Sequence, residues 1–193
     1  MLVKRLLAPI AVISAGFLAA CGGSGSGGSL SYQALVDDGD RLRARLEPVE
    51  ERSETVPTTG RATYTGVAAY GLSPMAEDYL DDPAVVSRVT LDADFADETI
   101  SGRLDNFRSK EAEISGSVDM LDGKIHHDGP GRGWLGADLA GSLAVNGEST
   151  EIVGELYGVF FGDNADVIKG DLGGILDGNE DMPVYGIFGA ERR

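Results

Sequence analysis

From Arg61 to the C-terminus, apolar and polar residues alternate along the chain in short runs. In the first run Tyr64, Ala68 and Tyr70 fall on one face, while Thr63 and Thr65 fall on the other. A period of two is typical of β-strands that bury one face and expose the other to water. The further runs of this kind are Val85–Phe95, Ile100–Leu104, Ile114–Met120, Leu139–Val145 and Ile152–Phe160.

Turn signals and glycines indicate how the strands are arranged. Asn146-Gly147 and Asp122-Gly123 are dipeptides typical of tight turns between paired strands. Glycines inside the runs would weaken a flat sheet, but they suit a sheet that bends sharply into a small closed barrel. Counting the runs gives about eight strands, the size of a barrel that its own side chains fill. The predicted fold class is therefore all-β, an eight-stranded antiparallel barrel with a short N-terminal helical segment.

The helical segment is predicted from Ser31 to Glu47, where apolar residues follow helical spacing. The sequence Asp37-Asp38-Gly39-Asp40 predicts an interruption, because aspartate and glycine are poor residues in a helix interior. We expect a short or broken helix followed by a polar stretch. Residues 30–59 would then form a helical and irregular connector, and residues 60–193 the barrel domain.

The first 29 residues predict export and a tether. Two basic residues precede an apolar stretch that is too short to span a bilayer, which is typical of a secretory signal peptide. The run Leu18-Ala19-Ala20-Cys21 resembles the cleavage box of bacterial lipoproteins. The resemblance implies a signal peptide at 1–20, lipid on Cys21 as the first mature residue, and a Gly/Ser tether at 21–29. An ordinary secreted protein with a chance cysteine is the alternative.

The implied anchor makes a membrane the first expected partner. A lasting anchor takes two or more acyl chains, which the modified cysteine would carry on its sulfur and amino group. Gly22 follows the cysteine, whereas bacterial lipoproteins that stay in the inner membrane often have aspartate there. The expected localisation is therefore the outer membrane, lipid-anchored, at the cell surface or the periplasmic face.

The charge of the chain limits its other partners. The sequence has 16 basic and 32 acidic residues, and loss of the signal peptide with its two basic residues takes the net charge from −16 to −18. This charge repels phosphate backbones, so no nucleic acid partner is expected. The acidity keeps a protein soluble, and steering of a cationic partner is the alternative, although no long block of one sign marks a binding face.

The sequence contains no catalytic constellation, so we expect no enzyme, no catalytic residue and no cofactor. The only histidines, His126 and His127, are neighbours whose side chains would point to opposite faces of a strand, and they therefore predict no metal site. One of them is a candidate ligand for haem, and two solvated histidines in a turn are the alternative. Asp177-x-Asn179-x-Asp181 begins like a calcium loop but lacks the required glycine and closing glutamate, which favours an acidic hairpin tip.

Two long stretches without alternation, 72–83 and 124–136, predict irregular loops. A rigid scaffold commonly presents its binding residues on such loops, and mobile loops without a role are the alternative. The candidate ligand-binding residues in these stretches are Tyr79, His126, His127 and Trp134.

The C-terminal third of the chain carries a resemblance to a known family. It contains Phe160-Phe161-Gly162-Asp163-Asn164-Ala165-Asp166 and closes with Tyr185-Gly186-Ile187-Phe188-Gly189-Ala190-Glu191-Arg192. These residues indicate a strand, a tight turn, a second strand, an acidic tip and a final strand. The stretch resembles the last hairpins of the barrel domain in transferrin-binding protein B and related surface lipoproteins. Phe161, Asp163 and Asp166 stand where that family often has tyrosine, proline and glutamate.

The resemblance implies a barrel and non-enzymatic binding, often of host iron or haem carrier proteins. This chain has room for one barrel without the handle domain that carries much of the partner contact in larger relatives, so transferrin itself does not carry over. Three functions remain open: a surface binding module for a protein or small solute, a binder of haem or an iron complex, and a structural envelope lipoprotein with no dedicated ligand. We favour the first, with iron or haem acquisition as the setting that the resemblance suggests.

The cleavage box gives a direct prediction about Cys21. Cys21→Ser removes the sulfur that would accept lipid, so the precursor should stay uncleaved or be mislocalised. Metabolic labelling with a fatty-acid analogue should mark the wild-type chain and leave the variant unlabelled. Equal labelling of both chains would contradict the prediction.

Overall fold

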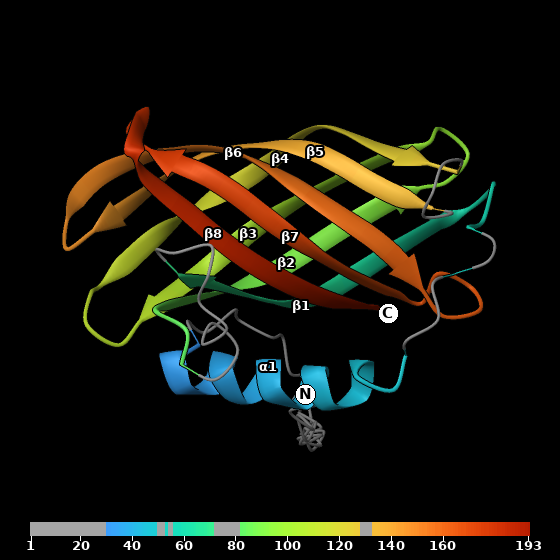
Figure 1. The fold of residues 1–193 in the computed structure, drawn as a ribbon, viewed down its shortest axis with the longest axis horizontal. Helices are drawn as coiled ribbons and strands as arrows, with labels where there is room; N and C mark the ends of the chain where they lie inside the picture. The colour runs from blue at the N-terminus through green and yellow to red at the C-terminus, as the bar shows by residue number, and fades with distance from the viewer. Residues whose placement is uncertain (1–29, 50–52, 54–55, 72–81, 128–132) are drawn as a thin grey trace, which may run out of the picture.

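Eight antiparallel strands close into a barrel in the computed structural model, and one helix lies along the outside of the barrel (Figure 1). The structure describes residues 30–49, 53, 56–71, 82–127 and 133–193. The elements are α1 (Tyr32–Leu46), β1 (Arg61–Gly71), β2 (Val85–Asp94), β3 (Thr99–Ser109), β4 (Ile114–His126), β5 (Trp134–Val145), β6 (Glu148–Phe161), β7 (Val167–Leu176) and β8 (Asn179–Arg192). Each strand pairs with the next in sequence, and β8 pairs with β1. The predicted fold class is confirmed.

The alternation of the sequence decides which side chains fill the barrel. Tyr64, Leu91 and Leu156 belong to predicted apolar faces, and all three are at most 1% exposed. They belong to one core cluster that draws residues from all eight strands. Positions between them face outwards, where the strands meet water or the helix.

The ladder between β1 and β8 closes the barrel, and it requires glycine at one point of contact. Gly66 pairs with Ala190 in this ladder. A Cβ atom on Gly66 would lie 1.8 Å from the carbonyl oxygen of Gly189 and 2.7 Å from the Cα atom of Ala190. Only a residue without a side chain lets the two backbones come this close.

Aromatic side chains fill one end of the barrel, where β1 begins and β8 ends, and we call it the plugged end. The ring of Phe160 lies 6.2 Å from the ring of Tyr64 and 6.1 Å from that of Phe95. The Tyr64 hydroxyl donates a hydrogen bond of 2.5 Å to the carbonyl of Ala165, in the turn between β6 and β7. Burial raises the pKa of Tyr64 far above its ordinary value, so the phenol stays neutral and remains a donor.

The connector between α1 and β1 adds to this plug. The Ser53 amide donates to the carbonyl of Phe160 over 3.0 Å, and its hydroxyl donates to the carbonyl of Gly162 over 2.5 Å. Val56 is buried in the core cluster. The core therefore extends upstream of the predicted domain start at residue 60.

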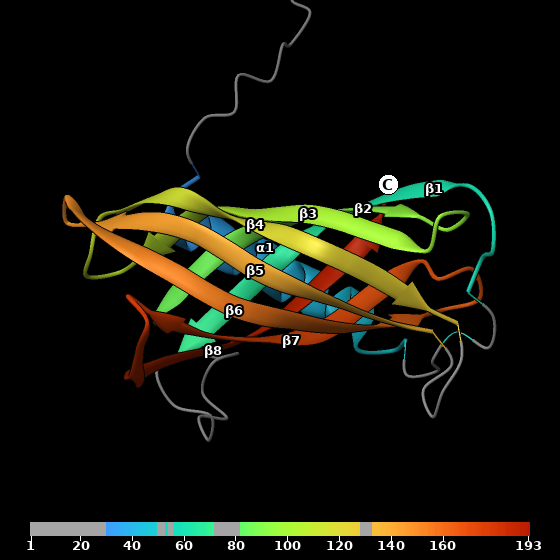
Figure 2. The same cartoon turned by 90° about the horizontal axis from the view of Figure 1, so that it is seen from above.

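Helix α1 lies across the strands on both sides of the closing seam between β1 and β8, and Figure 2 shows it from the other side of the barrel. Its buried residues are Leu35, Leu42 and Leu46. The Ser31 hydroxyl caps the first turn by accepting from the Ala34 amide over 3.2 Å. Gly189 makes the close approach of the helix possible, since a Cβ atom there would lie 2.9 Å from Leu46.

The predicted break in this helix is wrong, because α1 runs unbroken through the acidic stretch. Asp38 pairs with Arg41, and Asp40 pairs with Arg43 over 3.4 Å, each one turn later. A Cβ atom on Gly39 would meet Val67 of β1 at ordinary contact distance, 3.5 Å, so the helix passes close to the barrel at this point. Packing against the barrel outweighs the low helix propensity of these residues.

Two predicted turns have different outcomes. Asn146-Gly147 forms the turn between β5 and β6, with φ angles of 51° and 87°. Asp122-Gly123 is no turn but a bulge inside β4, where Asp122 has φ 51° and the register with β5 shifts. A bulge adds one residue to a strand and reverses its alternation. The strand therefore continues past the bulge to His126, and β5 begins at Trp134. The predicted loop over 124–136 is wrong at both of its ends, because residues 124–126 and 134–136 belong to strands.

The predicted signal peptide, Cys21, the tether and Tyr79 lie outside the described residues. Among the residues that are described, no helix has the length and apolar character needed to cross a membrane.

The contact at Gly66 predicts a large loss of stability on substitution. Gly66→Ala places a methyl group against backbone atoms of β8, and overpacking of this kind should lower the free energy of unfolding by about 1–3 kcal/mol or more. Urea unfolding followed by circular dichroism measures the loss. Gly173→Ala is the matched control, because a Cβ atom there meets nothing within 4 Å. Equal unfolding midpoints for the two variants would show that the seam tolerates a side chain.

Candidate functional site

Three rings from three neighbouring strands line up on the outer face of the barrel. His126 ends β4 and pairs with Trp134, the first residue of β5. Their rings are stacked, with centroids 3.7 Å apart and planes 14° apart. Tyr157 of β6 follows, its ring 5.7 Å from that of Trp134. We call these three residues the aromatic ladder.

The alternation of the strands directs the ladder outwards. Leu135 on β5 and Leu156 on β6 are buried in the barrel, so their neighbours Trp134 and Tyr157 face out. The absence of a side chain on Gly136 gives the indole room, since a Cβ atom there would lie 3.3 Å from the Trp134 ring. Tyr157 is 46% exposed, which is high for so large a side chain. The result is an accessible aromatic surface on rigid strands.

Of the three predicted ligand-binding residues that the structure describes, it brings two together. His126 and Trp134 are in contact, and they lie on strand ends instead of in a loop. His127 is not part of the ladder. Its Nε2 atom is buried without a hydrogen-bond partner among the described residues, 3.7 Å from a carboxylate oxygen of Glu98. The fourth residue, Tyr79, is not described.

The histidines are therefore not two solvated residues in a turn. The indole of Trp134 covers one face of the His126 ring, and the Nε2 atom of His127 is buried. Among the described residues, no group of three or more histidine, cysteine, aspartate or glutamate side chains is placed to hold a metal ion.

Tyr157 is the ladder residue that the sequence analysis missed. It lies inside the predicted run Ile152–Phe160, at a position between the buried residues. The same alternation that assigned Leu156 to the core assigns Tyr157 to the surface. An aromatic residue on the outer face of a strand was the available signal, but its neighbours across the sheet follow only from the register of β5 and β6.

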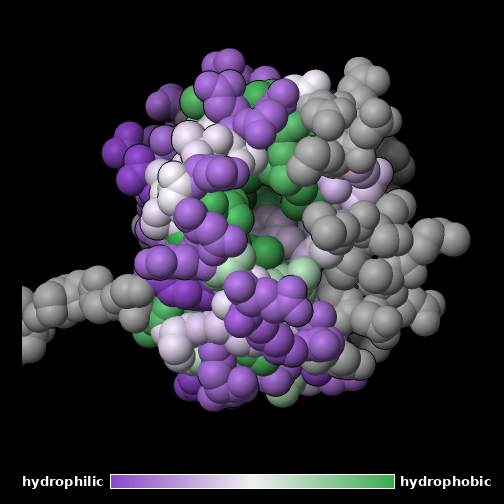
Figure 3. Space-filling model, turned by 90° about the vertical axis from the view of Figure 1, so that its left-hand side faces the viewer, coloured by the Kyte–Doolittle hydropathy of each residue, from purple (hydrophilic) through white to green (hydrophobic). Residues whose placement is uncertain are grey.

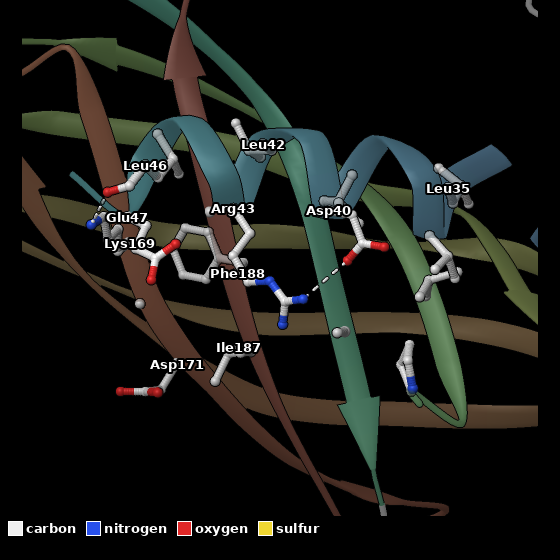
Figure 4. Close-up of a pocket in the computed structure, with 18 of the residues that line it drawn as sticks. Leu35, Asp40, Leu42, Arg43, Leu46, Glu47, Lys169, Asp171, Ile187 and Phe188 are labelled. Carbon is white, nitrogen blue, oxygen red and sulfur yellow. Dashed lines mark hydrogen bonds and ion pairs between the residues drawn. The ribbon is translucent and has the colours of Figure 1, made fainter. Parts of the chain in front are cut away.

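A groove of about 880 Å³ lies between α1 and the barrel, and Tyr157 lines it as well. Figure 4 shows Leu35, Leu42 and Leu46 along the helix, with Ile187 of β8 below them. Charged side chains border the groove: Asp40, Arg43, Glu47, Lys169 and Asp171. Because Tyr157 belongs to both, the aromatic ladder and the groove form one continuous outer surface.

Lys169 of β7 fastens the C-terminal end of α1 at one end of this groove. Its ammonium group donates to the carbonyl oxygen of Leu46 over 2.6 Å (Figure 4), and to that of Val49 over 2.8 Å. It also lies 4.8 Å from the centre of the Phe161 ring. A cation suits this position, because the last carbonyls of a helix carry partial negative charge. At the other end of the helix, the Tyr32 hydroxyl donates to the carbonyl of Pro83 over 2.7 Å.

A family model described as the C-lobe and N-lobe β-barrels of transferrin-binding protein B matches residues 56–192. No curated protein matches.

Among solved structures, the chain is similar to a double mutant of transferrin-binding protein B from Haemophilus parasuis Hp5. The identity is 18% and the TM-score 0.46, over 74% of this chain and 28% of that one. For the isotype 1 protein of serogroup B Neisseria meningitidis, the identity is 18% and the TM-score 0.45, over 71% of this chain and 26% of that one. The chain thus spans little more than a quarter of the length of these proteins.

The contacts of Lys169 predict that its loss frees the helix from the barrel. Lys169→Met keeps the length of the stem but removes both hydrogen bonds to the helix end, each of which contributes about 1–3 kcal/mol when the donor is charged. Hydrogen exchange of the α1 amides should accelerate at least tenfold while the strand amides stay protected. Lys124→Met, at an exposed position of β4, is the control. Unchanged exchange in α1 would show that Lys169 does not hold the helix.

Proposed function

Because this chain belongs to the family of β-barrels that form the C-lobe and N-lobe of transferrin-binding protein B, we propose that it is a non-enzymatic binding module for a protein or small solute. The aromatic ladder carries this proposal. Its rings come from strands whose other faces are packed in the core, so they are held in place before any partner arrives. Preorganised contacts lose little conformational entropy on binding.

The chemistry of the ladder favours a protein as the partner. Tyrosine and tryptophan are enriched in protein contacts, because each offers a large apolar ring together with a polar group. The groove beside the ladder adds apolar surface from α1 and the outer faces of β1 and β8. Such a continuous surface with a polar rim is typical of an interaction site.

Charge indicates which proteins fit. The mature chain would carry a net charge of −18, which speeds encounters with a partner that presents a basic face. The family is named after the binding of transferrin, so iron and haem carrier proteins are the first class to test. Iron or haem acquisition is the proposed setting.

We further propose that Cys21 anchors this module in the outer membrane. The cleavage box and the Gly/Ser tether support the anchor. A flexible tether of this length has a reach of roughly 15 Å, so it would hold the barrel close to the membrane surface.

The ladder predicts the effect of removing its central ring. A chain running from Gly22 to Arg193 is immobilised. It is exposed to iron-loaded transferrin, to haemoglobin and to a mixed protein extract. Trp134→Ala should weaken the binding of any partner recovered at least tenfold, because a central aromatic residue contributes about 2 kcal/mol or more to such contacts. Surface plasmon resonance measures the affinity.

Val153→Ala is the control for this experiment, since Val153 lies on β6, the strand that carries Tyr157, and is 56% exposed on the outer face. Equal weakening by both variants, or wild-type affinity in Trp134→Ala, would remove the ladder from the binding site. Haemin mixed with the chain would show a shifted absorption band if it binds. A shift that is lost in His126→Ala would favour the haem-binding function. A chain that recovers no partner and no haem would favour the structural envelope lipoprotein.

A further inference from the structure

The barrel is not filled along its whole length. At the end opposite the plug, where the β5–β6 and β7–β8 turns lie, its interior opens in a cavity of about 590 Å³. Figure 3 looks into this end and shows apolar residues in the hollow, with hydrophilic residues along the coloured part of its edge. We call this cavity the mouth. Its volume lies within the range of small-molecule sites, roughly 300–1,000 Å³.

The mouth exists because the large rings are distributed unevenly. Three aromatic rings meet in the plugged end, whereas Tyr70 and Phe107 are the only aromatic residues among the described ones that line the mouth, with their rings 5.7 Å apart on one wall. The other walls carry aliphatic residues, and Gly174 on β7 contributes no side chain. An eight-stranded barrel is wide enough to hold one small ligand wherever its own side chains do not fill it.

The floor and walls of the mouth are apolar. Six of the residues that line it are at most 6% exposed, namely Leu104, Phe107, Val118, Leu139, Leu143 and Leu172. The Tyr70 hydroxyl is already paired with Ser87 over 2.8 Å. Water gains few hydrogen bonds in such a space, and apolar cavities of even about 150 Å³ bind apolar molecules such as benzene.

The rim decides the charge of the ligand. Glu148 lies at the rim, and Asp177 lies in the turn between β7 and β8. Oxygens of Asn146 and Asp177 are engaged in the turns, where they accept from the Glu113 and Glu151 amides over 3.0 and 2.8 Å. No lysine or arginine is among the described residues that line the mouth. An anionic head group would therefore meet carboxylates and, in the described part of the rim, no cation.

We propose that the mouth of the barrel binds a small molecule that has an apolar body and no anionic group. This site is separate from the aromatic ladder, which lies on the outer face of the barrel at its other end. The inference goes beyond the proposed function, and its test needs neither a protein partner nor the lipid anchor.

The experiment uses the neutral fluorescent probe N-phenyl-1-naphthylamine with the chain from Gly22 to Arg193, which contains every residue of α1 and the barrel. We expect saturable binding of one probe per chain, with a blue shift in emission. Dodecyltrimethylammonium should displace the probe, while dodecanoate, with a similar chain and the opposite charge, should require at least tenfold higher concentration. Both are used below the concentrations at which they form micelles.

Two variants on β6 locate the site. Thr150→Trp places a ring in the mouth and should weaken probe binding at least tenfold. Val153→Trp places the same ring on the outer face of the same strand and should leave binding within twofold. Val184→Phe fills the mouth from β8 and should repeat the effect of Thr150→Trp. Circular dichroism confirms that each variant retains the strand spectrum.

Glu148→Gln tests whether the rim excludes anions. It should narrow the difference between the concentrations at which dodecanoate and dodecyltrimethylammonium displace the probe. Absence of saturable probe binding to the wild-type chain would overturn the proposal. Equal binding by Thr150→Trp and Val153→Trp would overturn it as well, since the probe would then bind elsewhere. Displacement by dodecanoate and dodecyltrimethylammonium at the same concentration would refute the exclusion of anions.

Discussion

The ladder between β1 and β8 is the contact on which the rest of the structure depends. Every other pair of strands is joined by a hairpin and forms between near neighbours in sequence, whereas this ladder joins the two ends of the sheet. Its close packing at Gly66 leaves no room for a side chain. Without it the sheet would have two open edges, and the interior residues of both would face water. Closure therefore creates the core, the plug and the mouth together.

Helix α1 protects this seam and is itself shaped by it. Its apolar side meets the outer faces of β1 and β8, at a place where Gly189 lets the helix approach the sheet. An ion pair of 2.7 Å joins Arg45 of the helix to Glu191 of β8 across the same region. Tyr32 and Lys169 fasten its two ends to the barrel. The helix thus covers an edge-to-edge contact and, in doing so, forms one wall of the groove beside the aromatic ladder.

The two ends of the barrel differ in how their interiors are filled. Rings, the Tyr64 hydrogen bond and the connector residues Ser53 and Val56 close the plugged end, so that end supplies tightly packed core. The mouth retains its apolar walls but lacks the side chains that would fill the space between them. On the outer face, Trp134 and its neighbours stand on strands that the plugged end keeps rigid. The barrel thus has two unlike features at opposite ends, an apolar cavity inside it and a row of aromatic rings on its outer face.

The sequence by itself determined the features that depend on near neighbours. A period of two assigned Tyr64, Leu91 and Leu156 to the core, because alternation along a strand is a local property of the backbone. The Asn146-Gly147 turn followed from the positive φ angles that a tight hairpin needs. The residues of the C-terminal hairpins identified the family. The first 29 residues gave an expected leader and anchor, which lie outside the described structure.

The tertiary structure alone decided the features that depend on distant partners. The bulge at Asp122-Gly123 reads as a turn in sequence, and only pairing with β5 shows that the strand continues. Packing on the barrel carries α1 through Gly39, although local propensity predicts a break. The aromatic ladder needs the register of three strands, since His126, Trp134 and Tyr157 are brought together by pairing across the sheet. The mouth results from side-chain volumes summed over all eight strands, a quantity that no short stretch of sequence contains.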